Sequence, residues 1–153
     1  MNAPTATKTM EAFGYPETLI ADYEWWCVLL RPKQPTLASL ILAAKSQTTA
    51  FSGLPPAAFS EMAIVVADIE KALKAFRPYD KINYLMLMMK DPEPHFHVIP
   101  RYSAEQKFED GSYEDPGWPG PPKLDVSHPI SHDASAKLIV SLQQCWPTLK
   151  TTE

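Results

Sequence analysis

The order of apolar and polar residues predicts two strands near the start of this chain. Residues 19–30 are rich in tryptophan, tyrosine, valine and leucine, which suit a partly buried pleated surface, and they predict one strand. Two prolines within residues 31–35 end that strand, and residues 36–44 (TLASLILAA) predict the next. Because the connection is short, we expect an antiparallel hairpin.

A helical pattern follows a polar loop over residues 46–54. The helix is predicted to begin at Pro55 and Pro56, which suit a first turn, and to end before Pro78. One face of this helix carries apolar side chains three or four positions apart: Phe59, Met62, Val66, Ile69, Leu73 and Phe76.

The second half of the chain predicts two more strands and a closing helix. Residues 81–89 (KINYLMLMM) and 94–102 (PHFHVIPRY) are mostly apolar and have the length of strands. Residues 103–131 are rich in proline and glycine and predict a long loop without a regular element. Residues 133–146 predict a helix that Ser131 or Asp133 caps.

Length and charge limit the possible functions. The 153 residues fit a single domain, with residues 1–14 expected to be a flexible N-terminus. A net charge of -4 gives no basic field for polymeric nucleic acid, so any phosphate site must be local. No stretch approaches the ~18 apolar residues of a membrane span. With only Cys27 and Cys145 there is no disulfide framework, and a cytoplasmic location is expected.

The candidate chemistry lies on the strand predicted over residues 94–102. His95 and His97 are one residue apart, so on a strand both side chains project to the same face. Glu93, two residues earlier, is placed to join them. Histidine changes its charge near neutral pH, and three ionisable groups on one face therefore predict a reactive surface.

Residues 93–102 read EPHFHVIPRY, and this stretch closely resembles the signature of the histidine triad (HIT) family, His-x-His-x-His followed by apolar residues. The resemblance spans roughly residues 17–123, including the region around 34–39, the long predicted helix and WPGPP at 118–122. The histidine strand carries most of its specificity.

The resemblance implies an α+β, HIT-like fold: an antiparallel five-stranded sheet with one long helix and a C-terminal helix, usually in a two-fold homodimer. It also implies binding of a nucleoside phosphate, such as a phosphoramidate or a dinucleoside polyphosphate. His95, at the middle triad position, would attack the α-phosphorus and form a phosphohistidine, which water hydrolyses. His97, at the third position, would hydrogen-bond a phosphate oxygen. No metal or other cofactor is expected in the covalent step.

Glu93 stands where the family has its first histidine. A carboxylate there repels a polyphosphate unless it is protonated or turned away, whereas near the leaving group it would act as acid or base. The alternative is that Glu93 has no functional role and is an ordinary solvated residue at the strand edge. Two functions therefore stay open: a hydrolase or nucleotidyltransferase, and a nucleotide-binding dimer that has lost catalysis.

Four more residues are candidates for substrate binding. Asn83 and Ser39, on strands expected beside the histidine strand, would bind ribose or phosphate, and Lys90 and Arg101 would bind phosphate. Each also has an ordinary interpretation, as a local hydrogen-bonding group, a surface lysine or half of an ion pair.

Two weaker alternatives complete the hypotheses. Trp25 and Trp26 would offer a wall for base stacking, although core packing suits at least one of them. The Glu-x-His-x-His sequence has the ligand types of non-haem iron proteins. This metal site ranks last, because such ligands usually approach the ion from different elements.

Overall fold

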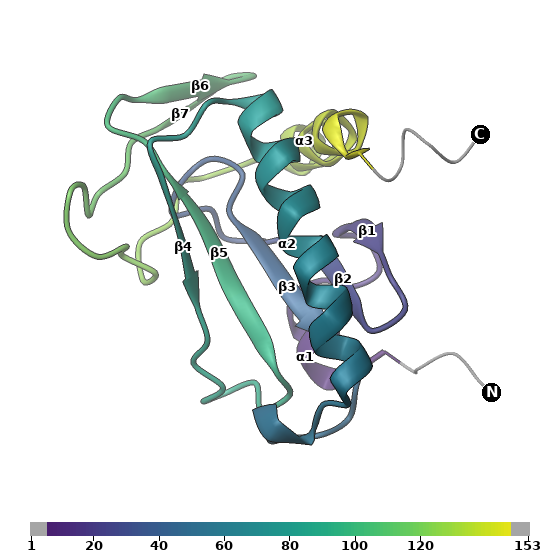
Figure 1. The fold of residues 1–153 in the computed structure, drawn as a ribbon. Helices are drawn as coiled ribbons and strands as arrows, with labels where there is room; N and C mark the ends of the chain where they lie inside the picture. The colour runs from purple at the N-terminus through teal and green to yellow at the C-terminus, as the bar shows by residue number, and fades with distance from the viewer. Residues whose placement is uncertain (1–5, 148–153) are drawn as a thin grey trace.

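An antiparallel sheet forms the centre of the structure, a computed structural model that describes residues 6–147 (Figure 1). The strands lie in the order β1-β2-β3-β5-β4, and every neighbouring pair is antiparallel. The predicted five-stranded α+β fold is confirmed. The strands of this sheet are β1 (Leu19–Asp22), β2 (Trp26–Leu30), β3 (Leu40–Ala44), β4 (Lys81–Leu85) and β5 (His95–Arg101).

The prediction of one strand over residues 19–30 is wrong, because the chain turns within it and forms β1 and β2. The turn is closed by Tyr23, whose backbone N–H donates to the carbonyl of Trp26 at 2.8 Å. Glu61, a helix residue far along the chain, accepts the backbone N–H groups of Glu24 and Trp25 at 3.1 and 2.6 Å. These long-range bonds satisfy the amides of the turn, and the local apolar pattern does not reveal them.

The two strands predicted over residues 36–44 and 81–89 are shorter than expected. β3 begins only at Leu40, since the residues before it form a tight turn around Gln34. The side-chain oxygen of Gln34 accepts the backbone N–H groups of Ala38 and Ser39 at 2.8 and 3.2 Å, and Ala38 has a φ of 69°. β4 ends at Leu85.

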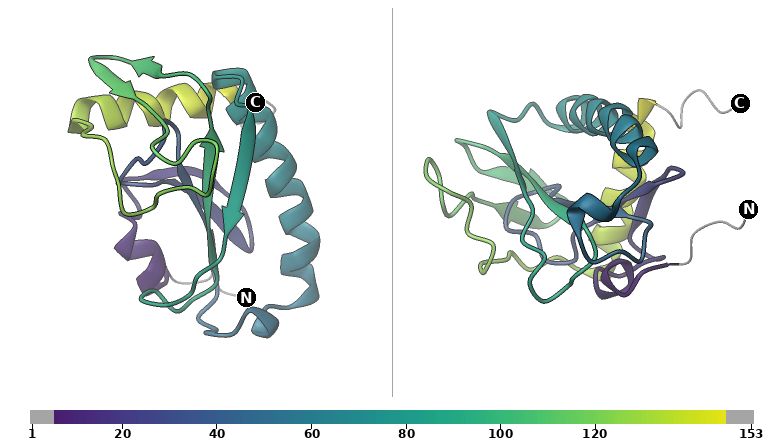
Figure 2. Two further views of the ribbon diagram at one scale, coloured as in Figure 1. Left: turned by 90° about the vertical axis from the view of Figure 1, so that its left-hand side faces the viewer. Right: turned by 60° about the horizontal axis from the view of Figure 1, so that its bottom comes forward.

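Helices α2 (Pro56–Phe76) and α3 (His132–Cys145) match the two predicted helices and cover one face of the sheet, opposite α1 (Figure 2). A short 3-10 helix, η1 (Phe51–Gly53), precedes α2. Within residues 6–147, no helix is long and apolar enough to cross a membrane.

The predicted apolar stripe of α2 is rotated relative to the buried face. Ile69 and Leu73 are fully buried, but Phe59 is exposed, and the small side chains of Ala58 and Ala72 face the sheet instead. The spacing of the large apolar residues does not predict which face of α2 is buried. Alanine adds little apolar area, but it allows the helix to approach the sheet closely.

Residues 1–14 were expected to be flexible, yet part of this stretch forms helix α1 (Lys8–Ala12). Residues 1–5 lie outside the described chain. The side-chain oxygen of Thr7 caps the helix by accepting the backbone N–H of Met10 at 3.0 Å. Met10 is buried against Cys27, Leu29 and Ile41, on the sheet face that α2 does not cover. A tertiary contact, which the local sequence does not indicate, thus fixes this short helix.

The predicted loop over residues 103–131 contains a hairpin of strands β6 (Gln106–Phe108) and β7 (Gly111–Tyr113). Glu109 makes the reversal with a φ of 51°, and Phe108 and Tyr113 are buried. The expectation of no regular element in this stretch is therefore wrong, because the proline-rich part begins only after the hairpin.

Candidate functional site

His95 and His97 lie side by side on β5, the strand between β3 and β4. In the sheet His95 pairs with Ala43 and His97 with Ile41, so both imidazoles face the side that carries α1. Their ring centroids are 5.4 Å apart. His95 is 2% exposed and His97 is 7% exposed. The alternation predicted from the sequence brings the two rings together, but both rings are buried.

The tautomer of His95 follows from one short contact. Its Nδ1 lies 2.9 Å from the backbone carbonyl oxygen of Glu93. A carbonyl oxygen only accepts hydrogen bonds, so Nδ1 carries the proton. In the neutral ring Nε2 then carries a lone pair. A nucleophilic imidazole attacks through such a nitrogen.

His97 has the opposite tautomer. Its Nδ1 accepts a hydrogen bond from Nε of Arg31 at 3.2 Å, which leaves the proton of the neutral ring on Nε2. Burial, followed by the charges of Arg31 and His95, lowers the pKa of His97 to about 4. At neutral pH His97 is therefore an uncharged N–H donor.

Arg31 is a site residue that the sequence interpretation missed. It is 8% exposed, and its Nη1 donates to the carbonyl of Lys33 at 2.7 Å. Within residues 6–147, no carboxylate forms an ion pair with this guanidinium. Burial lowers its pKa. The one sequence signal was an arginine directly after the fully buried strand β2.

Glu93 is buried and fastens α1 to the sheet. Its Oε1 accepts the hydroxyl of Thr9 at 2.5 Å and the backbone N–H of Thr9 at 3.2 Å. With 6% exposure, the interpretation of Glu93 as a solvated strand-edge residue is wrong. The carboxylate is turned toward α1, so its hydrogen bonds serve the helix.

Phe13, which follows α1, covers the histidine pair. Its ring centroid lies 5.6 Å from that of His95 and 5.7 Å from that of His97. Glu93 thus holds the helix that places an aromatic ring over His95 and His97.

A cavity of about 370 Å³ adjoins this cluster. Lysines 33 and 90 contribute two cations in addition to Arg31, against a single carboxylate, so the cavity favours an anion. The predicted candidate Lys90 thus lies beside the histidine site. The lining residues are Ala12, Phe13, Arg31, Pro32, Lys33, Lys90 and Asp91.

Asn83 and Arg101 share the sheet face of the histidines, but they bind each other, and Arg101 also binds the proline-rich loop. Arg101 donates to Oδ1 of Asn83 at 2.7 Å, to the carbonyl of Gly120 at 2.9 Å, and to the buried carboxylate of Asp115 at 2.5 Å. The structure does not bring these two polar groups to the histidines.

The remaining candidates have local partners. Ser39 is fully buried and donates to the carbonyl of Thr36 at 2.8 Å, within the turn before β3. Trp26 is a core residue whose Nε1 donates to the carbonyl of Ala58, and Trp25 is partly buried against the same core. In the part of the chain that the structure describes, no group of three or more His, Cys, Asp or Glu is arranged to hold a metal ion.

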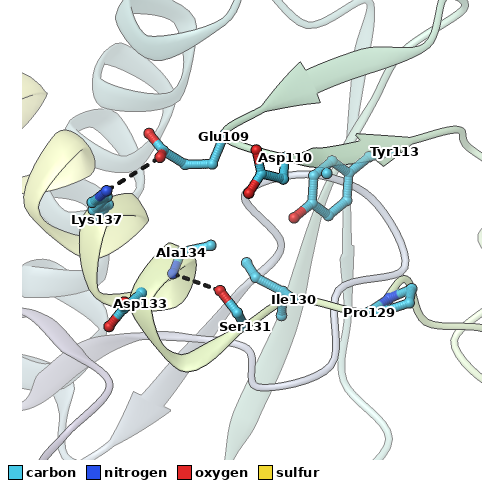
Figure 3. Close-up of a pocket in the computed structure, with 10 residues that line it drawn as sticks. Glu109, Asp110, Tyr113, Pro129, Ile130, Ser131, Asp133, Ala134 and Lys137 are labelled. Carbon is cyan, nitrogen blue, oxygen red and sulfur yellow. Dashed lines mark hydrogen bonds and ion pairs between the residues drawn. The ribbon is translucent and has the colours of Figure 1, made fainter.

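A second cavity, of about 560 Å³, lies between the β6–β7 hairpin and α3 (Figure 3). Glu109, Asp110 and Asp133 line it, and Lys137 forms an ion pair with Glu109 at 3.3 Å. Its excess of carboxylates repels phosphate. Of these two cavities, only the cationic one beside the histidines has a lining whose charge favours an anion.

Comparison with solved structures identifies the fold. Histidine triad proteins from Marinobacter aquaeolei VT8 and Sinorhizobium meliloti 1021 match with TM-scores of 0.74 and 0.72, at 19% and 20% identity. The matches cover 97% and 92% of this chain, and 99% and 96% of those chains. A histidine triad protein from Bradyrhizobium japonicum matches with a TM-score of 0.69 at 21% identity, over 95% of this chain and 99% of that one.

The chain therefore has the histidine triad fold. This confirms the resemblance of the sequence at the level of the fold. No protein-family model matches the sequence, and none of the curated proteins compared matches it.

Proposed function

We propose that this chain binds a nucleotide and acts as a hydrolase or nucleotidyltransferase on its α-phosphate, with His95 as the nucleophile. One observation carries the proposal: the hydrogen bond from Nδ1 of His95 to the carbonyl of Glu93, which leaves the lone pair on Nε2. His97 stands beside it as a neutral donor for a phosphate oxygen. The histidine triad proteins of the same fold support this assignment.

The reaction proceeds in two displacements. Nε2 of His95 attacks the α-phosphorus, an N–P bond forms, and the bond to the leaving phosphate or amine breaks with its electron pair. The leaving group takes a proton from solvent. Water or another acceptor then attacks the phosphorus, the N–P electrons return to Nε2, and the acceptor loses its proton. The N–H of His97 stabilises the charge on the phosphoryl oxygens in both steps.

The test is intact-protein mass spectrometry after brief mixing with adenosine 5′-phosphoramidate or a diadenosine polyphosphate. We expect a nucleotidyl adduct or released AMP with the wild type and with His132→Ala, a matched control at the start of α3. His95→Ala should give neither while it keeps the fold. Equal activity of His95→Ala and the wild type would contradict the assignment of His95 as the nucleophile.

A second candidate is a nucleotide-binding protein without turnover. The observation that favours it is the cover over the histidines, because His95 is only 2% exposed beneath Phe13. Nucleotide binding by calorimetry with neither adduct nor product would establish this alternative. Turnover that disappears in His95→Ala would remove it.

We also propose a homodimer in a reducing cytoplasm. β4 is an outer strand of the sheet, and Leu87 and Met89, which follow it, are exposed apolar side chains. An outer strand with apolar neighbours suits pairing with a second copy of the chain. Both described cysteines are free thiols, which agrees with a reducing compartment. Light scattering after gel filtration measures the oligomeric state.

A further inference from the structure

We propose that the cationic cavity beside the histidines binds a polyphosphate chain, so that the preferred substrate carries several phosphates and is not a nucleoside phosphoramidate. The inference rests on the proposed function and chooses between its two substrate classes. Its basis is the arrangement of Arg31, Lys33 and Lys90 around one cavity.

Arg31 is the central observation. A buried charge is costly unless an opposite charge compensates it, yet the described partners of this guanidinium are Nδ1 of His97 and the carbonyl of Lys33, both neutral. A phosphate oxygen in the cavity would supply the missing negative charge. The planar guanidinium suits this role, because its remaining N–H groups match the spacing of phosphate oxygens.

The two lysines extend the positive surface along the cavity. Lys33 belongs to the turn after β2, whereas Lys90 belongs to the connection between β4 and β5, and both are exposed at the rim. Asp91 is the one acidic residue of the lining. The lining of this cavity is therefore positively charged although the whole chain has a net charge of -4.

The position of the cavity links it to the reacting atoms. Arg31 lines the cavity and binds His97, and Phe13 lines it and packs on both histidine rings. A nucleotide with its α-phosphate at the histidines therefore extends its further phosphates toward the lysines. An amine leaving group gains nothing from this surface, since an ammonium would be repelled by it.

Binding of stable nucleotides tests the inference. We would titrate the full chain with AMP and with the α,β-methylene analogues of ADP and ATP. The ATP analogue should bind at least about tenfold more tightly than AMP, and salt should reduce this preference. Lys33→Gln combined with Lys90→Gln should remove most of the preference. The control is Lys71→Gln with Lys107→Gln, two exposed lysines elsewhere, which should retain it.

Kinetics provide the second arm. We expect kcat/KM for diadenosine tetraphosphate to exceed that for adenosine 5′-phosphoramidate by about tenfold or more. The variant with both Lys33→Gln and Lys90→Gln should lower kcat/KM for the tetraphosphate and leave that for the phosphoramidate unchanged. AMP binding as tight as that of the ATP analogue, or equal effects of the lysine pair on both substrates, would overturn the inference alone. If no nucleotide binds or reacts, the proposed function fails together with it.

Discussion

Nε of Arg31 donates to Nδ1 of His97 across 3.2 Å and thereby links the end of β2 to the middle of β5. The bond needs a lone pair on Nδ1 and therefore exists only with a neutral imidazole. Protonation of His97 would break it and place two positive charges side by side in a buried site. The charge state of this histidine is thus coupled to the integrity of the site.

The first prediction concerns stability and pH. The pKa of His97 falls from 6.5 to about 4 on folding, so between these values the unfolded chain binds a proton that the folded chain does not. The free energy of unfolding should be highest above pH ~6.5 and fall as the pH drops toward ~4, by at most about 3 kcal/mol and less where solvent reaches the ring.

Urea unfolding near pH ~7.5 and ~4.5 measures this effect. His97→Gln should lose less stability than the wild type over this interval, because it has no imidazole to protonate. His132→Gln, which changes an exposed histidine, should behave like the wild type. The same pH dependence in all three proteins would show that His97 has an ordinary pKa in the folded chain.

The second prediction concerns the cause of that low pKa. Arg31→Gln removes a positive charge that opposes protonation of His97, so the pKa of His97 should rise, although burial should keep it below 6.5. Arg31→Lys keeps the charge and should raise it less. Histidine NMR titration measures each value, and Arg77→Gln, whose guanidinium binds elsewhere, is the control. An unchanged titration in Arg31→Gln would mean that burial and the charge of His95 lower the pKa of His97 without a contribution from Arg31.

The sequence could predict what depends on local periodicity. The strand over residues 94–102 appears as β5 (His95–Arg101), and the two-residue alternation of a strand is enough to bring His95 and His97 together. The predicted helices likewise match α2 and α3, because their apolar spacing and terminal prolines or caps are local signals.

The rest of the site depends on contacts between distant segments. Arg31 and His97 are 66 positions apart, and Thr9 and Glu93 are 84 positions apart. Neither pair follows a periodic pattern. The attachment of α1 therefore had no local sequence signal, and Arg31 had only its place directly after an apolar strand. Asn83 and Arg101 lie on the expected face, but the pairing of Arg101 with Asp115 depends on the path of an irregular loop.

The third prediction concerns Glu93. Glu93→Ala removes the acceptor for two hydrogen bonds of Thr9 and should lower the free energy of unfolding by roughly 1–3 kcal/mol. Glu93→Gln keeps an acceptor oxygen and should cost less. Urea unfolding measures both, and Glu17→Ala, at an exposed carboxylate, is the control. If Glu93→Ala were as stable as this control, Glu93 would not anchor α1.

The fourth prediction concerns access to His95. Nε2 of His95 must be reached by a phosphorus atom, but the ring of Phe13 packs against both histidines and leaves His95 nearly buried. Phe13→Ala should therefore expose the pair, and diethyl pyrocarbonate, which acylates neutral imidazole nitrogens, should modify His95 several times faster than in the wild type.

Peptide mass mapping of the modified histidine measures that rate. Phe51→Ala is a matched control, because Phe51 is an exposed ring that packs on Phe59 and Phe96, away from the histidine pair. Nucleotide should protect His95 in Phe13→Ala, since the same opening admits the substrate. Unchanged modification of His95 in this variant would mean that another part of the chain controls access. Faster modification without faster nucleotidyl transfer would place the limiting step after opening, in the chemistry or in product release.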